Sequence, residues 1–286
     1  MTEFAVRPRR SALYLPASNP RAIEKARTLG SDVVILDLED AVAPDAKVEA
    51  RALAVEAARA GGFGARELVI RVNGLDTPWG AEDLAAVAGA RPDAVLIPKV
   101  SGPSDLAPYA GAGAPLWAMI ETCAAVFALD AIGRASAAAK VGVWVIGTND
   151  LVKEMRCNPG LDRAPLQPAL ALSVMAARAH GVSILDGVWN DIADLPGLER
   201  ECAQGAAFGF DGKTVIHPSH VAAANTAFAP DPEAVAWARK VAAAFDLQEN
   251  AGKGVLKVEG RMVERLHLAQ ARRLIAVAQA IAAHEA

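Results

Sequence analysis

Aromatic residues and cysteines are scarce in this chain of 286 residues, and no basic surplus is present. Only 5% of the residues are aromatic, three are cysteines, and the formal net charge is −4. Because Cys123, Cys157 and Cys202 stand singly, they exclude a disulfide framework and a cysteine metal site, and they favour a reducing compartment. The lack of a basic field argues against nucleic acid or an anionic membrane as the main partner.

Long apolar runs are also missing. A membrane-spanning helix needs about 20 apolar residues, and no run approaches this length. The apolar stretch Ala12–Pro16 is too short for the core of a signal peptide. We therefore expect a cytoplasmic protein. Hydrophobic residues make up 53% of the chain and charged residues 22%, which excludes disorder and provides one large domain or two small ones with a full core.

What the sequence does contain is one repeated pattern, a short β-branched run followed by an Ala-rich stretch with helical spacing. This alternation is typical of a parallel sheet. The predicted strands are Ala12–Leu15, Val33–Leu38, Leu68–Val72, Ala94–Pro98, Leu116–Ile120, Val141–Ile146, Ser183–Leu185 and Thr214–Ile216.

Eight such units predict an α/β protein with the TIM (β/α)8 barrel fold, whose usual size is about 250 residues. A doubly wound open sheet is the alternative, but it would usually carry a Gly-rich fingerprint after the first strand, and none is there. We predict a catalytic barrel domain over residues 1–229 and a C-terminal helical extension over residues 230–286. The extension reads as two helices, Pro232–Phe245 and Arg261–Ala283, that pack on the barrel or on a neighbouring subunit.

Two acids, Glu121 and Asp150, follow the fifth and sixth predicted strands, at the end of a barrel where active sites lie. Two carboxylates without an adjacent His or Cys suit Mg²⁺, or Mn²⁺ in its place, and not zinc. The alternative is that each acid starts the helix that follows it, where the helix dipole favours negative charge. Spacing alone favours the metal site only slightly.

Arginines and a lysine supply the positive charge that an anionic ligand would need. Arg71 ends the third strand, where a buried guanidinium needs an anionic partner. That partner is either a ligand or the neighbouring acids Asp37 and Glu39. Arg21 and Lys25 lie one turn apart after the first strand, either as a phosphate site or as ordinary solvated charges.

Several motifs together resemble the citrate lyase β-subunit-like group of the HpcH/HpaI aldolase superfamily, which includes malyl-CoA, citramalyl-CoA and citryl-CoA lyases. The ordered set is far more specific than any one motif. It consists of Arg10–Pro16, Ile35–Val42, Arg71–Asn73, Met119–Thr122, Gly209–Lys213 and Ile216–Pro218.

The resemblance implies a Mg²⁺-dependent carbon–carbon lyase that converts a 3-hydroxy-dicarboxyl-CoA thioester to acetyl-CoA and a 2-oxo acid. Glu121 and Asp150 then correspond to the metal ligands, and Arg71 to the substrate-binding arginine. The backbone at Gly147 and Thr148 corresponds to the oxo-acid carboxylate site. Arg21 and Lys25 fall where the family binds the phosphates of coenzyme A.

One departure concerns the family's acid/base, usually an Asp that a neighbouring subunit contributes from a Gly-Lys-Met-(Ile/Val)-Asp segment. The matching stretch, Gly260–Glu264, ends in Glu264 instead. An extra methylene moves a carboxyl group by roughly 1.5 Å, which can change the rate strongly. The resemblance implies a homo-oligomer, a trimer or hexamer, with shared active sites. Three alternatives stay open: a thioesterase, an aldolase of free acids, and a non-catalytic oxo-acid-binding homologue.

Overall fold

The computed structural model describes residues 7–285 of the chain. These residues form two compact units. The first is Arg9–Phe228 and contains the barrel, and the second contains residues 229–285. Each unit has its own apolar core, so each is described by itself.

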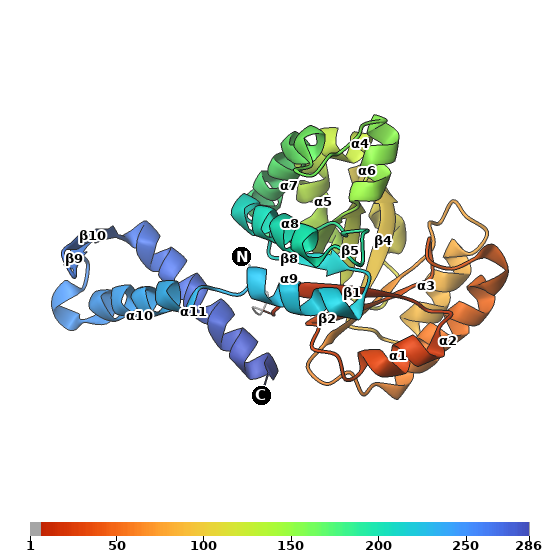
Figure 1. Ribbon diagram of the computed structural model, residues 1–286, viewed down its shortest axis with the longest axis horizontal. Helices are drawn as coiled ribbons and strands as arrows, with labels where there is room; N and C mark the ends of the chain where they lie inside the picture. The colour runs from red at the N-terminus through yellow and green to blue at the C-terminus, as the bar shows by residue number, and fades with distance from the viewer. Residues whose placement is uncertain (1–6, 286) are drawn as a thin grey trace. The chain divides into compact units, whose positions relative to one another are not determined.

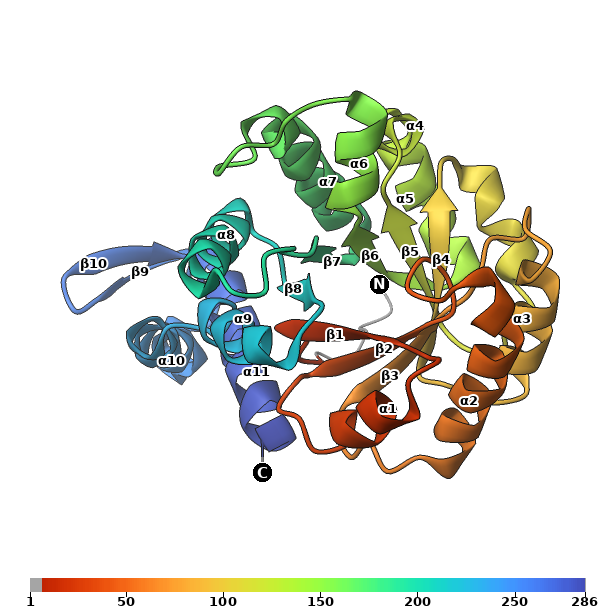
Figure 2. The same ribbon diagram turned by 45° about the vertical axis from the view of Figure 1, so that its right-hand side comes forward.

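Eight parallel strands close into a barrel in the unit Arg9–Phe228, each paired with the next and the last with the first (Figures 1 and 2). They are β1 Ser11–Pro16, β2 Val33–Asp37, β3 Glu67–Arg71, β4 Ala94–Val100, β5 Leu116–Ile120, β6 Val141–Ile146, β7 Ser183–Asp186 and β8 Gly212–Val215. The predicted (β/α)8 barrel is thus confirmed. All eight predicted strands are present, with ends that shift by at most two residues.

Alternate side chains of the strands fill the barrel interior, because successive residues of a strand point to opposite faces. They form an apolar cluster separate from the larger one between strands and helices. Its buried members are Ala12, Val33, Ile35, Val69, Ala94, Leu96, Trp117, Met119, Val143, Val145 and Leu185. The interior is therefore a packed core, which leaves the carboxyl ends of the strands for chemistry.

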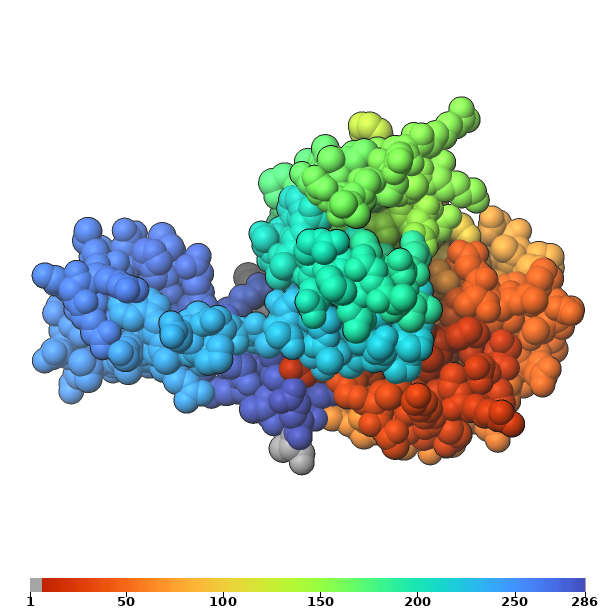
Figure 3. Space-filling model, in the orientation of Figure 1, coloured from red at the N-terminus to blue at the C-terminus, as the bar shows by residue number. Residues whose placement is uncertain are grey.

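Helices surround the barrel on its outside. They are α1 Pro20–Ala26, α2 Lys47–Ala60, α3 Gly80–Ala88, α4 Cys123–Phe127, α5 Leu129–Ala139, α6 Thr148–Met155, α7 Gln167–His180, α8 Leu195–Phe208 and α9 Val221–Ala227. Helices α8 and α9 lie side by side over β8 (Figure 1). Their atoms form adjoining parts of the surface in the space-filling view (Figure 3). Among residues 7–285, no helix combines the length and the apolarity that crossing a membrane requires.

The second unit consists of α10 (Pro232–Asp246), an antiparallel hairpin of β9 (Val255–Val258) and β10 (Arg261–Glu264), and α11 (Arg265–Glu285). Its core lies between the helices and the hairpin and includes the buried side chains of Phe245 and Val263.

The predicted helix Arg261–Ala283 is wrong at its start, because residues 261–264 form a strand. Glu259 and Gly260 both have positive φ angles, 47° and 83°, which reverse the chain. The residues on either side then pair in antiparallel register. Leu256, Val258 and Val263 are buried at alternate positions of the hairpin, and this period of two outweighs the helical propensity of the segment.

Candidate active site

Four strand ends direct polar or small residues toward the mouth of the barrel. The interior cluster includes one residue near the end of each of these strands, Ile35, Val69, Met119 and Val145. The residues two positions further along face the same way. They are Asp37, Arg71, Glu121 and Gly147, at the ends of β2, β3, β5 and β6. Two of the predicted site acids and the predicted site arginine therefore share one layer.

Arg71 is held by two acids of the neighbouring strand. Its Nε and Nη2 atoms donate to the two carboxylate oxygens of Asp37 at 2.7 and 2.6 Å. Its Nη1 atom lies 2.9 Å from Oε2 of Glu39. Burial opposes the charge, but Asp37 and Glu39 outweigh it and raise the pKa of Arg71 well above its usual value. A guanidinium has five N–H groups. These contacts occupy three, so the ion pairs and a role in ligand binding are compatible.

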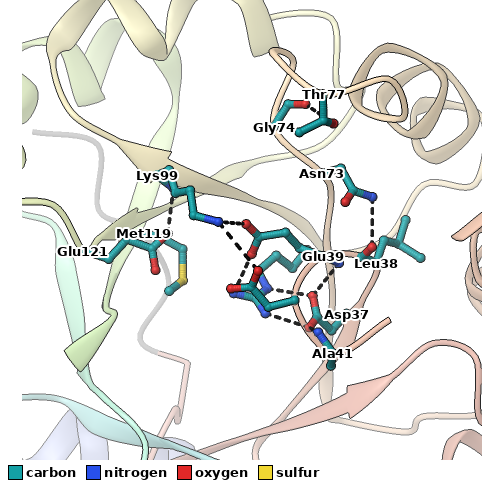
Figure 4. Close-up of polar contacts among 12 residues, drawn as sticks. Asp37, Leu38, Glu39, Ala41, Asn73, Gly74, Thr77, Lys99, Met119 and Glu121 are labelled. Atoms are coloured by element: carbon teal, nitrogen blue, oxygen red, sulfur yellow. Dashed lines mark hydrogen bonds and ion pairs between the residues drawn. The ribbon is translucent and has the colours of Figure 1, made fainter. Parts of the chain in front are cut away.

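Lys99 orients two acids at once. It lies where the register of β4 shifts, with a φ angle of 52°. Its backbone N–H donates to Oε1 of Glu121 at 2.7 Å, and its Nζ atom donates to Oε1 of Glu39 at 2.5 Å (Figure 4). Sequence reasoning assigned Lys99 no role. The available signal was a lysine inside an otherwise apolar strand, which needs an anionic partner.

Glu121 is almost completely buried, with 1% of its surface exposed. Burial is the main reason that its pKa rises to about 7. The Lys99 N–H and the charge of Arg71 act against this rise. The negative charges of Glu39 and Asp150 add to the rise. The positive charge near Glu121 is therefore too small to balance its burial and the neighbouring acids.

Glu121 does not start the next helix. The side chain of Thr122 takes that place, since it accepts a hydrogen bond from the N–H of Ala125 at 3.0 Å. The carboxylate instead faces Gly147, where an added Cβ would lie 2.3 Å from Oε2 of Glu121. The glycine therefore leaves space that the carboxylate occupies.

The donors around Glu121 fit a hard divalent cation. Asp150 lies in the first turn of α6, and the side chain of the buried Thr148 lies between the ends of β6 and β7, close to Gly187. Among residues 7–285, no group of three or more His, Cys, Asp or Glu side chains could hold a metal ion. Mg²⁺ suits a site of two carboxylates, because it usually keeps several water or substrate oxygens as ligands.

A second group of polar residues braces the loop after β2. The buried Nζ atom of Lys47 donates to the carbonyl oxygens of Leu38 and Glu39, both at 2.9 Å, and to Oδ1 of Asn73 at 2.7 Å. Asn73 in turn donates to Asp83 at 2.6 Å. It also donates to the carbonyl oxygen of Leu38 at 2.9 Å (Figure 4). Sequence reasoning did not identify Lys47, because it lies in a helix and contacts the loop only after folding.

Three predicted site residues, Arg21, Lys25 and Glu264, are exposed and take no part in the contacts described above. Arg21 and Lys25 are exposed on α1. Glu264 ends β10 in the other unit, where its side chain is exposed and its N–H donates to Nδ1 of His267 at 2.9 Å. Their proposed roles therefore depend on a bound ligand or on a second subunit.

The family model described as HpcH/HpaI aldolase/citrate lyase matches residues 10–218. The chain belongs to this family. A second model, a carbon–carbon bond lyase of the TIM-barrel fold, matches residues 162–282. The family resemblance inferred from the sequence motifs is thus confirmed.

Known members of the HpcH/HpaI aldolase/citrate lyase family include relatives of nearly full length. A (3S)-malyl-CoA thioesterase of Cereibacter sphaeroides is 47% identical over 98% of both chains. An L-malyl-CoA/β-methylmalyl-CoA lyase of the same species is 34% identical over 97% of this chain and 96% of the lyase. These two relatives catalyse different reactions, so membership in the family does not decide which reaction a member catalyses.

Solved structures of this family share the architecture. The CitE protein of Mycobacterium tuberculosis, in complex with magnesium, acetoacetate and coenzyme A, is 30% identical, with a TM-score of 0.76 over 96% of this chain and 99% of CitE. RipC of Yersinia pestis is 29% identical, with a TM-score of 0.68 over 80% of this chain and 99% of RipC.

Proposed function

We propose that the chain is a Mg²⁺-dependent enzyme that acts on a 3-hydroxy-dicarboxyl-CoA thioester of the malyl-CoA class, and that it hydrolyses the thioester. The observation that carries the substrate class is the layer of Glu121, Arg71 and Gly147 at the mouth of the barrel, with Asp150 nearby. Identity of 47% to a (3S)-malyl-CoA thioesterase supports hydrolysis.

Glu121 and Asp150 would hold Mg²⁺, or Mn²⁺ in its place. When bound, the ion acts as a Lewis acid toward an oxygen of the ligand. The chain itself prepares this site: the Lys99 N–H fixes one oxygen of Glu121, and Gly147 leaves the other one room. The magnesium complex of the related CitE protein supports the assignment.

In hydrolysis, water adds to the thioester carbonyl carbon, and the carbon–sulfur bond then breaks. The products are the free hydroxy acid and coenzyme A, and the sulfur takes up a proton. Arg71 is suited to bind a carboxylate of the substrate or to stabilise the developing oxyanion, because its position is fixed before the ligand arrives.

Carbon–carbon cleavage is the second candidate, because a malyl-CoA/β-methylmalyl-CoA lyase is 34% identical over nearly the whole chain. In this reaction the 3-hydroxyl group loses its proton, the carbon–carbon bond breaks, and the thioester enolate takes up a proton. The products are acetyl-CoA and a 2-oxo acid. Both reactions need the same contacts to the carboxylate group of the substrate.

The remaining assignments complete the proposal. The Gly147–Thr148 backbone would bind a carboxylate of the acid, and Arg21 and Lys25 would bind coenzyme A phosphates. Glu264 would supply the proton-transferring carboxyl group to the barrel of a neighbouring subunit, in a trimer or hexamer. An exposed Glu264 is compatible with this role, because among residues 7–285 its carboxylate has no ion pair or hydrogen bond that would compete.

The test measures all four products from (3S)-malyl-CoA in excess Mg²⁺ and in EDTA. Hydrolysis predicts equal amounts of malate and free coenzyme A, whereas lyase activity predicts acetyl-CoA and glyoxylate. Both should stop in EDTA and return with Mg²⁺. Turnover that persists in EDTA would contradict the roles of Glu121 and Asp150. No turnover of malyl-, citramalyl- or citryl-CoA would favour a binding protein.

A further inference from the structure

Tyr14 spans the floor of the barrel mouth. It lies on β1 and packs against the interior cluster. Its hydroxyl group is 3.3 Å from Sδ of Met119, which lies on β5. In a closed barrel of eight strands, β1 and β5 are opposite each other. The ring therefore crosses the interior, and its hydroxyl group lies near the barrel axis beneath the polar layer.

The surroundings of this hydroxyl group belong to the candidate site. The guanidinium carbon of Arg71 lies 5.0 Å from the centre of the Tyr14 ring, so the ring supports the arginine from one side. Met119, which contacts the hydroxyl group through its sulfur, also lies beside Gly147 through its Cε atom. The phenol is thus in contact with residues on both sides of the mouth.

The hydroxyl group has only a weak partner. Its one hydrogen bond among residues 7–285 goes to the Met119 thioether, and thioether sulfur is a poor acceptor. Tyr14 is partly buried, and a phenol in a protein interior normally finds a stronger partner. Because the hydroxyl hydrogen rotates about the Cζ–Oη bond, it can turn toward an incoming oxygen while no heavy atom moves.

The charge state of Tyr14 makes it a donor and not a base. Burial is the main cause of a pKa raised above the usual value for tyrosine, and Asp37, Glu121 and Glu39 add to the rise, although Arg71 opposes it. The phenol therefore stays protonated throughout the physiological pH range, with its hydrogen available for an acceptor.

We infer that Tyr14 is a ligand-binding residue, whose hydroxyl group donates a hydrogen bond to a carboxylate or keto oxygen of a short oxo or hydroxy acid held beside Arg71. This inference rests on the proposed function for the class of ligand. It adds a contact from the floor of the barrel to the contacts at its rim.

The Tyr14→Phe variant tests this directly, because it removes one oxygen and keeps the ring under Arg71. Calorimetry measures the binding of glyoxylate, pyruvate and oxaloacetate in the presence of Mg²⁺, and of Mg²⁺ alone. We expect about tenfold weaker affinity for the acids that the wild type binds, since a hydrogen bond to a charged group is lost. Affinity for Mg²⁺ alone and the melting temperature should stay close to those of the wild type.

The matched control is Tyr109→Phe, which changes the chain's other tyrosine. The Tyr109 hydroxyl group accepts a hydrogen bond from the Leu75 N–H at 3.3 Å and has no contact with Arg71 or Met119. Its acid affinity should not change.

Unchanged acid affinity in Tyr14→Phe, or a wild type that binds none of the three acids, would overturn the inference. The proposed function fails separately, when wild-type protein binds an acid with Mg²⁺ but turns over no thioester. In that case the Tyr14→Phe affinity still decides the role of the phenol.

Discussion

At the scale of single residues, the site depends on the absence of one atom as much as on charged groups. Gly147 has a φ angle of −97°, so its backbone would accept any residue. The space around Gly147 excludes a side chain, because an added Cβ would lie 2.3 Å from Oε2 and 2.4 Å from Cβ of Glu121. The requirement for glycine is therefore steric and concerns the position of a single carboxylate.

Gly147→Ala should displace Glu121 and lower turnover of malyl-CoA about a hundredfold, which is the order of loss expected from a shift of about 1 Å in a reacting group. It should also weaken Mg²⁺ binding in calorimetry. Gly30→Ala is the control, because an added Cβ there meets nothing within 4 Å. Equal activity of the two variants would show that the Glu121 carboxylate can move without loss.

At the scale of elements, local irregularities place the important groups. The register shift in β4 turns the Lys99 N–H toward Glu121 instead of into the ladder. An L-residue at positive φ costs roughly 1–2 kcal/mol. Two ion-paired or hydrogen-bonded acids, Glu39 and Glu121, offset this cost.

The turn of the C-terminal hairpin gives a prediction at the same scale. Glu259 and Gly260 both have positive φ angles, which in a two-residue hairpin favours Asn-Gly. Glu259→Asn should stabilise the protein by about 0.5 kcal/mol, because Asn tolerates this conformation and the exposed ion pair with Lys240 contributes little. Gly260→Ala should destabilise it by about 1 kcal/mol. Chemical denaturation measures both, and a stabilising Gly260→Ala would contradict the turn.

At the scale of the whole molecule, stability should depend on the buried His220. Burial is the main reason that its pKa lies below the usual value for histidine. Among residues 7–285 neither ring nitrogen of His220 has a hydrogen-bond partner, and the nearby His217 and Lys213 lower the pKa further. Because the folded pKa is lower than the unfolded pKa of about 6.5, the unfolded chain binds the proton first.

We therefore predict that the free energy of unfolding falls as the pH drops below about 6.5. His220→Asn should remove part of this dependence, even though the variant is less stable at every pH. His267→Asn, at the start of α11 where the side chain is half-buried, should retain the wild-type profile. Urea denaturation at pH 7.5, 6.5 and 5.5 measures the difference. Parallel profiles for wild type and His220→Asn would contradict the prediction.

The assembly itself can be tested by complementation. Glu121→Gln and Glu264→Ala should each lose most of the turnover of malyl-CoA. The two variants are then coexpressed in equal amounts, so that they assemble at random. If Glu264 acts on a neighbouring barrel, about one site in four contains both a wild-type Glu121 and a wild-type Glu264. Turnover should then recover toward that fraction. If the mixed oligomers stay inactive, Glu264 does not act on a neighbouring barrel: it acts on its own barrel or has no catalytic role.

Much of this molecule could be predicted from the order of its residues. Apolar runs separated by helical stretches predict eight strands, since each buried strand must be apolar on both faces. The acids and the arginine at the strand ends could also be predicted to lie close together, because a barrel brings the carboxyl ends of all its strands to one rim. The hairpin in the C-terminal unit was not, because four residues are too few for a period of two to stand out against a long helix.

By itself, then, the sequence determined the barrel, the family, and the set of acids and the arginine that ends β3. Only the tertiary structure decided how they meet. It placed Arg71 between Asp37 and Glu39, used the backbone of Lys99 to hold Glu121, and brought Tyr14 across to Met119. The first two sets of contacts join neighbouring strands and the last joins β1 to β5 across the barrel, so the pairing and closure of the sheet set their distances. Local patterns contain no record of such distances.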